Sequence, residues 1–344
     1  MAVFTTINDP SVHFQATAYT GNGNNNKQIV HYGNSNLQPD FLWIKQRTGS
    51  TRDHILLDST SGVTKNFRTN TSDAQYTNSN YLNSFDSDGF TLNTSNRVND
   101  ADDPYSAWAW KANGGTQVTN GDGSTNSYLQ VNSTAGFVLG KYTAPGSTGT
   151  TVGHGLGAIP DFFFAKDFGS GGWYGMFPTS FGSNQSTGLN STNGFGTVSG
   201  YSNFTTTTFT QGQGDSDNHM FWAWKNTPGY FYANYYKSNN NADGPFQYCG
   251  FKPALVITKG DGGGVNWRIY DSQRNGYNPS NAFVSCNTDA VETNATNSEM
   301  EFYSNGFKLT AAEGDANYND MDVAFAAWAD HPFMSSTGVP TTAR

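Results

Sequence analysis

Apolar and polar positions alternate over short stretches of this chain, and the same stretches occur three times. Each copy contains a proline followed by an apolar run, in residues 39–45 (PDFLWIK), 160–166 (PDFFFAK) and 253–259 (PALVITK). In PDFLWIK both sets of alternating side chains are largely apolar. This pattern predicts a central strand that is covered on both faces.

Two further stretches follow each proline strand in a constant order. The first is a short strand in residues 84–92, 203–211 and 301–309, and the second ends in Trp110, Trp224 or Trp328. Such repetition predicts three copies of one structural unit, in which the three tryptophans occupy equivalent core positions. We therefore expect an all-β fold of three tandem β-sandwich repeats, jelly-roll or lectin-like, with very little helix.

The repeat positions also predict where the parts of the chain begin and end. The expected parts are an N-terminal segment 1–13, repeat 14–112, a polar linker 113–133 with one weak strand, repeats 134–228 and 229–333, and a C-terminal tail 334–344. The tail has little apolar content, so we expect it to lie on a partner or to be mobile.

Composition favours the same fold class. Charged residues make up 13% of the chain and aromatic residues 15%, beside many Gly, Asn, Ser and Thr residues. A disordered chain lacks aromatic residues that bury area, and long helices need more Ala, Leu, Glu and Lys. Turn-forming residues between β-branched and aromatic runs indicate strands.

Charge and hydropathy exclude two classes of partner. The formal net charge is −9 and the 18 Lys and Arg residues are scattered, which argues against nucleic acid. No run of about eighteen apolar residues is present, so we expect no membrane insertion. The start, MAVFTTINDP, lacks the pattern of a secretory signal, and we expect Cys249 and Cys286 to be separate thiols.

Acidic loops precede each tryptophan strand and are the candidate metal site. Clustered carboxylates suit calcium, which takes six to eight oxygen ligands, whereas the alternative is an ordinary solvated turn. The candidate calcium ligands are Asp100, Asp102, Asp215, Asp217, Asp320 and Asp322. No other cofactor is expected.

Catalytic patterns are missing from the sequence. Glycan hydrolysis needs two carboxylates across a cleft, yet the four glutamates (Glu292, Glu299, Glu301 and Glu313) all fall in the third repeat. No GxSxG motif is present, and the six histidines fall at unrelated points of the repeats. We expect no enzymatic activity.

Aromatic side chains are the candidate ligand-binding groups. Exposed aromatic rings beside Asp, Asn and Arg are typical of sugar-binding surfaces, whereas the alternative is that the rings form the sandwich core. The candidate glycan-binding residues are Trp173, Tyr174, Trp267 and Tyr270.

Long phrases of the chain resemble a family of virion structural proteins of tailed, often marine, bacteriophages. The phrases include residues 83–92 (NSFDSDGFTL), 98–115 (VNDADDPYSAWAWKANGG) and 243–259 (DGPFQYCGFKPALVITK), and the resemblance extends from about Ala16 to Phe333. It implies repeated lectin-like β-sandwich units on the outer surface of a virion, made in the host cytoplasm. It supplies no catalytic residue, and the acidic loops depart from its usual Ser, Gly and Thr, so calcium gains no support from it.

Two functions remain open. The first is a non-enzymatic tail or fibre appendage subunit that contacts host-surface polysaccharide. The second is a capsid decoration protein with a purely structural role. In both, the partners are other virion proteins and copies of the same chain. We expect the copies to associate because several weak sites together bind tightly, and a trimer is the expected state for an appendage, although no coiled coil or other pattern in the sequence fixes the number.

Overall fold

The computed structural model describes residues 5–197, 200–294, 300–312, 314–318, 320–335 and 337–340. The fold is nearly all β, with 44% strand and 2% helix. The helical elements are the 3-10 helix η1 (Pro10–Val12) and the helix α1 (Asn96–Asn99). Within these residues no helix is long and apolar enough to cross a membrane.

The first sandwich, β1 to β9, packs a six-stranded sheet against a three-stranded sheet. The larger sheet has the order β1-β9-β3-β4-β5-β6 and the smaller has the order β2-β8-β7. The strands are β1 (Phe14–Thr20), β2 (Lys27–Ile29), β3 (Phe41–Gln46), β4 (Ile55–Asp58), β5 (Lys65–Phe67), β6 (Tyr76–Thr77), β7 (Leu82–Asp86), β8 (Gly89–Leu92) and β9 (Pro104–Trp110).

The second sandwich, β10 to β20, has a larger sheet of order β10-β11-β12-β20-β14-β15. Its smaller sheets are β13-β19-β18 and the pair β16-β17. The strands are β10 (Val118–Asn120), β11 (Ser127–Asn132), β12 (Phe137–Thr143), β13 (Thr150–Gly153), β14 (Phe162–Asp167), β15 (Trp173–Met176), β16 (Gln185–Ser186), β17 (Gly196–Thr197), β18 (Tyr201–Ser202), β19 (Thr208–Gln211) and β20 (Asn218–Trp224).

The third sandwich, β21 to β29, has a larger sheet of order β21-β29-β23-β24-β25-β26 and a smaller sheet β22-β28-β27. The strands are β21 (Phe231–Lys237), β22 (Phe246–Tyr248), β23 (Phe251–Gly260), β24 (Trp267–Asp271), β25 (Ala282–Ser285), β26 (Thr293–Asn294), β27 (Met300–Tyr303), β28 (Gly306–Leu309) and β29 (Asp322–Pro332).

The three larger sheets share a four-strand antiparallel motif. The motif is β1-β9-β3-β4 in the first sandwich, β12-β20-β14-β15 in the second and β21-β29-β23-β24 in the third. Trp110, Trp224 and Trp328 hold matching places in it, because each lies between a residue of the opening strand and a residue of the proline strand.

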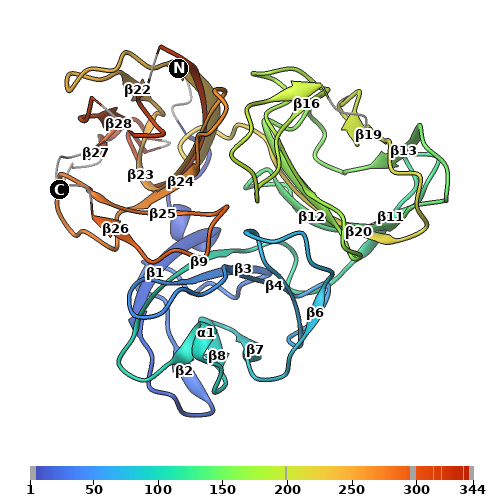
Figure 1. Cartoon of the computed structure of the whole chain (residues 1–344), viewed down its shortest axis with the longest axis horizontal. Coiled ribbons are helices and arrows are strands. Elements are labelled where there is room, and N and C mark those ends of the chain that lie inside the picture. Colours follow the sequence, from blue (N-terminus) through green and yellow to red (C-terminus); the bar gives the residue numbers. More distant parts are fainter. Residues whose placement is uncertain are drawn as a thin grey trace.

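The three sandwiches surround a common centre, with the larger sheets facing inward and the smaller sheets outward (Figure 1). One apolar core joins the inward faces of the three larger sheets. In addition, each sandwich has a core of its own between its larger and smaller sheets. Phe41 and Trp43 of β3 point into the common core, whereas Leu42 and Ile44 point into the core of the first sandwich. The expected central strand with two apolar faces is therefore confirmed.

Three tryptophans meet in the common core. The ring centroids are 5.4 Å apart for Trp110 and Trp328, 5.4 Å for Trp224 and Trp328, and 5.9 Å for Trp110 and Trp224. All three side chains are at most 1% exposed. Their prediction as core residues is confirmed, and the edge-to-face geometry is one that aromatic pairs prefer.

Segment 113–133 contains the expected weak strand, but it belongs to the second sandwich and does not form a separate linker. It supplies β10 and β11, which extend the larger sheet of the second sandwich. Leu129 enters the core of that sandwich, which is why this weakly apolar stretch is held in the sheet. Ile7 of the N-terminal segment likewise packs in the common core.

The two ends of the chain and the two cysteines are also the subject of predictions. Residues 1–4 and 341–344 lie outside the described part of the chain, and a turn with an isolated bridge from Met334 to Pro340 occupies the described tail. Cys249 and Cys286 are separate buried thiols, as expected. Burial raises the pKa of both thiols, which keeps them protonated and unreactive.

Candidate ligand-binding cleft

A cleft of about 1040 Å³ opens between the first and third sandwiches. Its walls come from the N-terminal segment, β1 and loop 30–40 on one side, and from loop 272–281, β23, β27 and β29 on the other. The lining residues are Ser11, Phe14, Gln15, Ala16, Tyr32, Gly33, Asn34, Lys252, Ala254, Ser272, Gln273, Asn275, Gly276, Tyr277, Asn278, Phe302, Ala329, Asp330 and His331.

The first lip of the cleft is loop 30–40, which contains Tyr32 and Gly33. Gln15 on β1 fixes this loop: its Oε1 accepts a hydrogen bond from the backbone N–H of Gly33 (2.7 Å), and its Nε2 donates to the carbonyl of Ser35 (2.7 Å). A Cβ at position 33 would lie 2.6 Å from Ser11 Cβ and 2.7 Å from the Gln15 side chain, so a larger residue there would displace these side chains. These hydrogen bonds attach the lip to β1.

The second lip is loop 272–281. At its start Asp271 accepts hydrogen bonds from the backbone N–H (2.9 Å) and from Nε (2.7 Å) of Arg274, and both side chains are fully buried. At its far end Asn278 pairs with the backbone of Phe302, accepting from its N–H (2.9 Å) and donating to its carbonyl (2.6 Å). Both ends of this lip are therefore anchored to the third sandwich.

Buried charges lock the second lip to the first sandwich. Trp108 Nε1 donates to Asp271 Oδ2 (3.0 Å), and Arg274 lies 3.5 Å from Glu292. Glu292 in turn accepts two hydrogen bonds from Arg47 of the first sandwich (2.9 and 3.0 Å). Because each buried charge has an opposite partner, this network fixes how the two lips face each other.

Both lips are the longest versions of links that occur in all three sandwiches. The links into the proline strand are 30–40, 154–161 and 249–250, or eleven, eight and two residues. The links after the next strand are 59–64, 177–184 and 272–281, or six, eight and ten residues. The two longest links meet at the cleft, so the fold itself does not require the residues that form it.

The surface of the cleft combines exposed rings with amides. Tyr277 is 90% exposed and Tyr32 is 78% exposed. The lining amide side chains that do not anchor the lips are Asn34, Gln273 and Asn275, whereas Gln15 and Asn278 are engaged with the backbone. Lys252 is paired with Asp330 (2.9 Å), so these two opposite charges balance each other. Aromatic faces beside hydrogen-bonding amides are suited to a neutral polar ligand.

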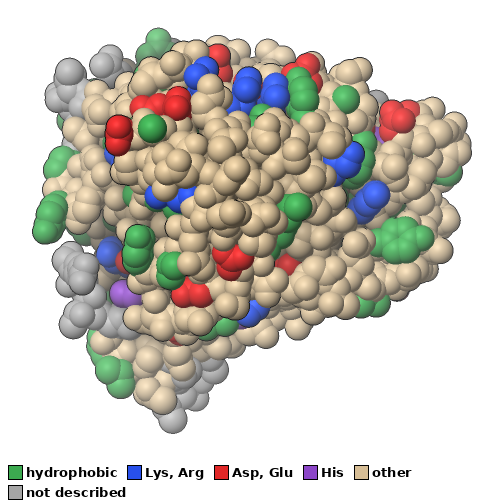
Figure 2. Space-filling view, turned by 90° about the horizontal axis from the view of Figure 1, so that it is seen from below, with side chains coloured by type: hydrophobic (Ala, Val, Ile, Leu, Met, Phe, Trp, Pro, Cys, Tyr) green, Lys and Arg blue, Asp and Glu red, His purple; other side chains and the backbone are tan. Residues whose placement is uncertain are grey.

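Charge is mixed on the face of the molecule seen in Figure 2. Acidic and basic side chains are interspersed there and form no field of one sign. Steering of a strongly charged partner would need such a field.

The rings that sequence reasoning selected for glycan binding lie elsewhere. Trp267 and Tyr270 are fully buried and Trp173 is 3% exposed, so these three belong to the packed interior and offer no face to a sugar. Tyr174 is half-buried and packs edge-on against Tyr201, with centroids 5.1 Å apart. Trp173 and Trp267 are buried because the neighbouring sandwiches cover the inward face of each large sheet, and Tyr270 is buried between the two sheets of its own sandwich.

Two of these tryptophans hold the sandwiches together. Each donates its indole N–H to a backbone carbonyl of the preceding sandwich, and His54 makes the corresponding contact from the first sandwich to the third. The contacts are Trp173 to Arg68 (3.0 Å), Trp267 to Gly188 (2.9 Å) and His54 to Ser285 (3.0 Å). The three contacts close a ring around the common core.

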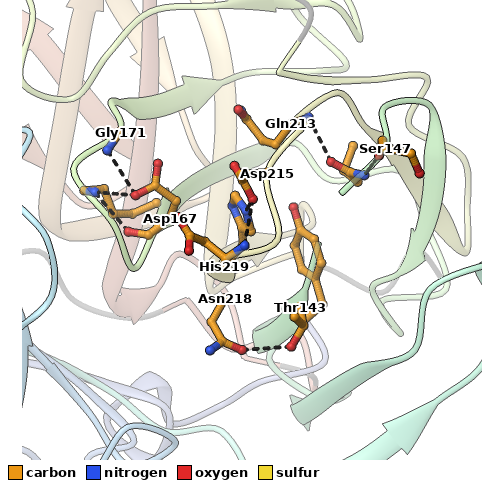
Figure 3. Close-up of polar contacts among 12 residues, drawn as sticks. Thr143, Ser147, Asp167, Gly171, Gln213, Asp215, Asn218 and His219 are labelled. Atoms are coloured by element: carbon orange, nitrogen blue, oxygen red, sulfur yellow. Dashed lines mark hydrogen bonds and ion pairs between the residues drawn. The ribbon is translucent and has the colours of Figure 1, made fainter. Parts of the chain in front are cut away.

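The acidic loop of the second sandwich is tied to its own sheet (Figure 3). Asp215 Oδ1 lies 2.9 Å from His219 Nε2 and accepts a hydrogen bond from the backbone N–H of Asp217 (3.0 Å). His219 Nδ1 lies 3.2 Å from the Tyr201 hydroxyl. The Asp215 carboxylate therefore already has partners within the protein.

The other predicted calcium ligands lie in separate turns. Asp102 and Asp320 have positive φ angles of 64° and 50°, which marks turn positions, and Asp322 lies 3.5 Å from Lys237. Asp100 caps the end of α1. In the described part of the chain no group of three or more His, Cys, Asp or Glu residues is placed to hold a metal ion.

Comparison with known proteins gives one family. The model of a domain of unknown function, DUF7483, matches residues 9–332 and so spans all three sandwiches. Neither the curated proteins nor the solved structures contain a match to the chain. The chain therefore belongs to the DUF7483 family.

Proposed function

We propose that the protein is a non-enzymatic structural subunit on the outside of a tailed-bacteriophage virion, of the tail or fibre type, and that the cleft binds host-surface glycan. The observation that carries the glycan proposal is that the two longest links of the fold meet at this cleft. Each link presents a largely exposed tyrosine, Tyr32 or Tyr277.

The chemistry of the cleft supports a sugar ligand. Aromatic faces stack on the apolar faces of sugar rings, and amides can both donate to and accept from hydroxyl groups. The lips are anchored by Gln15, Asp271 and Asn278, so little conformational entropy is lost when a ligand binds.

A binding role is favoured over hydrolysis. Among the described residues that line the cleft, Asp330 is the one carboxylate, and it is paired with Lys252. Glycoside hydrolysis generally uses two carboxylates on opposite sides of the scissile bond.

The virion assignment rests on the resemblance of the sequence to phage structural proteins. A capsid decoration protein remains the second candidate, because the described residues form a compact body around one core rather than an extended shaft. Density for the protein in images of the particle, on the capsid lattice or at the tail, distinguishes these two positions.

Binding measurements on cleft variants test the glycan proposal. We expect the pure protein to bind members of a glycan array and to release no new reducing ends from them. Replacing Tyr32 or Tyr277 with Ala should weaken binding by about tenfold or more. Replacing Tyr128, which is 46% exposed, lies on β11 of the second sandwich and does not line the cleft, should leave binding unchanged.

Three outcomes would overturn the proposal. The first is that no glycan binds, and the second is that the cleft variants bind as well as the parent. The third is release of oligosaccharide that stops when a particular carboxylate is removed, which would make the protein an enzyme.

A further inference from the structure

The outer sheet of the third sandwich carries three exposed aromatic side chains, which we call the aromatic patch. Phe246 and Tyr248 lie on β22 and Tyr303 lies on β27, and they are 44%, 57% and 38% exposed. Phe246 reaches Tyr303 edge-on with centroids 5.9 Å apart, across the strand β28 between them. The other face of this sheet packs on the sandwich core through Phe302 and Phe307.

The other sandwiches show that the fold does not require aromatic residues at these positions. Strand register places Phe246, Tyr248 and Tyr303 opposite Lys308 and Gly306 of β28. In the first sandwich, Gln28, Val30 and Asp86 take the places of Phe246, Tyr248 and Tyr303. In the second sandwich, Thr151 and Gly153 take the places of Phe246 and Tyr248. Three exposed rings in one sandwich alone point to a surface that binds something.

The polar groups around the aromatic patch are hydrogen-bonded within the third sandwich. Lys308 Nζ is paired with Asp243, and the Tyr303 hydroxyl donates to the Glu301 carboxylate. The patch therefore presents aromatic rings and one hydrogen-bonded carboxylate, and it carries no excess of positive charge that would attract a nucleic acid. Sugar rings, with apolar faces and hydroxyl edges, fit this surface.

The aromatic patch and the cleft share the strand β27. Phe302 lines the cleft, and its backbone is paired with Asn278 of the second lip. Tyr303 is the next residue of the same strand, and its side chain turns to the outer face. A chain of sugars that leaves the cleft past Asn278 would therefore meet the patch.

We infer that the aromatic patch is a second sugar-binding surface that extends the cleft, so the ligand is a neutral polysaccharide segment long enough to contact both. This inference rests on the proposed glycan function of the cleft. It names the ligand as a polymer rather than a terminal sugar.

Chain-length dependence of binding tests the inference. The probes are laminarin, mannan and galactan, each as the intact polymer and as short oligosaccharides of about two to four sugars, a length that fills the cleft alone. The patch variant combines Phe246→Gln with Tyr248→Val, the residues that the first sandwich has at these positions. The cleft variant is Tyr277→Ala, and the control is Tyr128→Ala.

We expect the patch variant to bind the intact polymer about tenfold more weakly than the parent and the short oligosaccharide equally well. The cleft variant should lose affinity for both, and the control for neither. Equal melting temperatures of parent and variants would show that the fold is intact. If the double variant does not fold, Tyr248→Val alone gives the same comparison.

The outcomes separate the two claims. If the cleft variant loses binding while the patch variant binds polymer as the parent does, the inference is wrong and the cleft function stands. If the patch variant changes the oligomeric state measured by light scattering and leaves polymer binding intact, the patch is a contact between copies of the chain. If the parent binds none of the probes, both the cleft function and the inference fail.

Discussion

Single residues that recur in the three sandwiches serve packing. Lys45, Lys166 and Lys259 are the next-to-last residues of the proline strands, and each buries its ammonium group against backbone carbonyl oxygens. Burial lowers the pKa of Lys45 and of Lys259 to about 8. The candidate ligand contacts, in contrast, are residues such as Tyr32 and Tyr277 that only one sandwich has. Residues that are repeated in the sequence therefore indicate the packed core, and residues that differ between the repeats indicate the candidate ligand site.

Trp224 provides a test of the common core. Trp224→Ala removes a fully buried ring that packs against Trp110 and Trp328, and we expect a loss of about 3–5 kcal/mol in the free energy of unfolding. Denaturant unfolding of parent and variant measures this loss. The exposed control Tyr128→Ala should change stability by at most about 0.5 kcal/mol, and a Trp224 variant that unfolds like the parent would contradict the packing.

His54 makes the contact between the first and third sandwiches sensitive to acid. Trp43 Nε1 donates to His54 Nδ1 (2.9 Å), so the neutral ring carries its hydrogen on Nε2 and donates it to the Ser285 carbonyl. Burial, aided by the nearby charge of Lys45, lowers the pKa of His54 well below 6.5. Protonation would place a second N–H against the Trp43 indole.

We expect stability from neutral His54 to be present above about pH 6.5 and to be lost as the pH falls toward the lowered pKa, because the unfolded chain takes up the proton first. His31, whose pKa burial lowers to about 4, acts in the same direction. Asp58, whose pKa burial raises to about 6, acts in the opposite direction. Melting temperatures across this pH range should fall less steeply for His54→Gln than for the parent. Equal slopes would show that His54 does not titrate as described.

At the scale of elements, the sequence predicts the strands better than the links between them. The proline strands β3, β14 and β23 and the tryptophan strands β9, β20 and β29 lie where their apolar patterns place them. The patterns do not show which apolar face of a sheet meets a neighbouring sandwich. For this reason the sequence allows a surface role for Trp173 and Trp267, which are buried in the structure. Loop 30–40 and loop 272–281 have no apolar period, and only their extra length relative to the other copies could have indicated the cleft.

Gly89 tests the pairing of the small outer sheet of the first sandwich. It has a φ angle of 110°, and a Cβ there would lie 1.9 Å from the Ile29 carbonyl oxygen. Gly62 has a φ angle of 89° but open space around it, so it is a matched control for backbone strain alone. We expect Gly62→Ala to cost about 1–2 kcal/mol, and Gly89→Ala to cost about 1–3 kcal/mol more because β2 must move away from β8. Equal costs in denaturant unfolding would refute the close approach.

At the scale of the whole molecule, the common core makes three sandwiches into one body. Buried residues from all three contribute to it, and the contacts of Trp173, Trp267 and His54 close the ring. The three sandwiches of one chain are thus arranged around a centre as three identical subunits would be in a trimer. Association of several chains stays a prediction, to be measured by light scattering.

The shared core predicts cooperative unfolding. We expect one calorimetric transition whose van't Hoff and calorimetric enthalpies agree, because separating any sandwich exposes the aromatic faces of all three. A fragment of residues 113–228, which holds every strand of the second sandwich, should not fold alone, since Phe162 and Trp224 would lie on its surface. Three separate transitions, or a folded fragment, would contradict the shared core.

Hydrogen exchange with and without a bound polysaccharide tests the central claim, that the cleft between the first and third sandwiches is the ligand site. The probe is the tightest-binding polymer among laminarin, mannan and galactan. We predict that protection increases in loop 30–40 and loop 272–281 and stays unchanged in the acidic loop around Asp215. Protection confined to the second sandwich, with none in the two lips, would contradict the account.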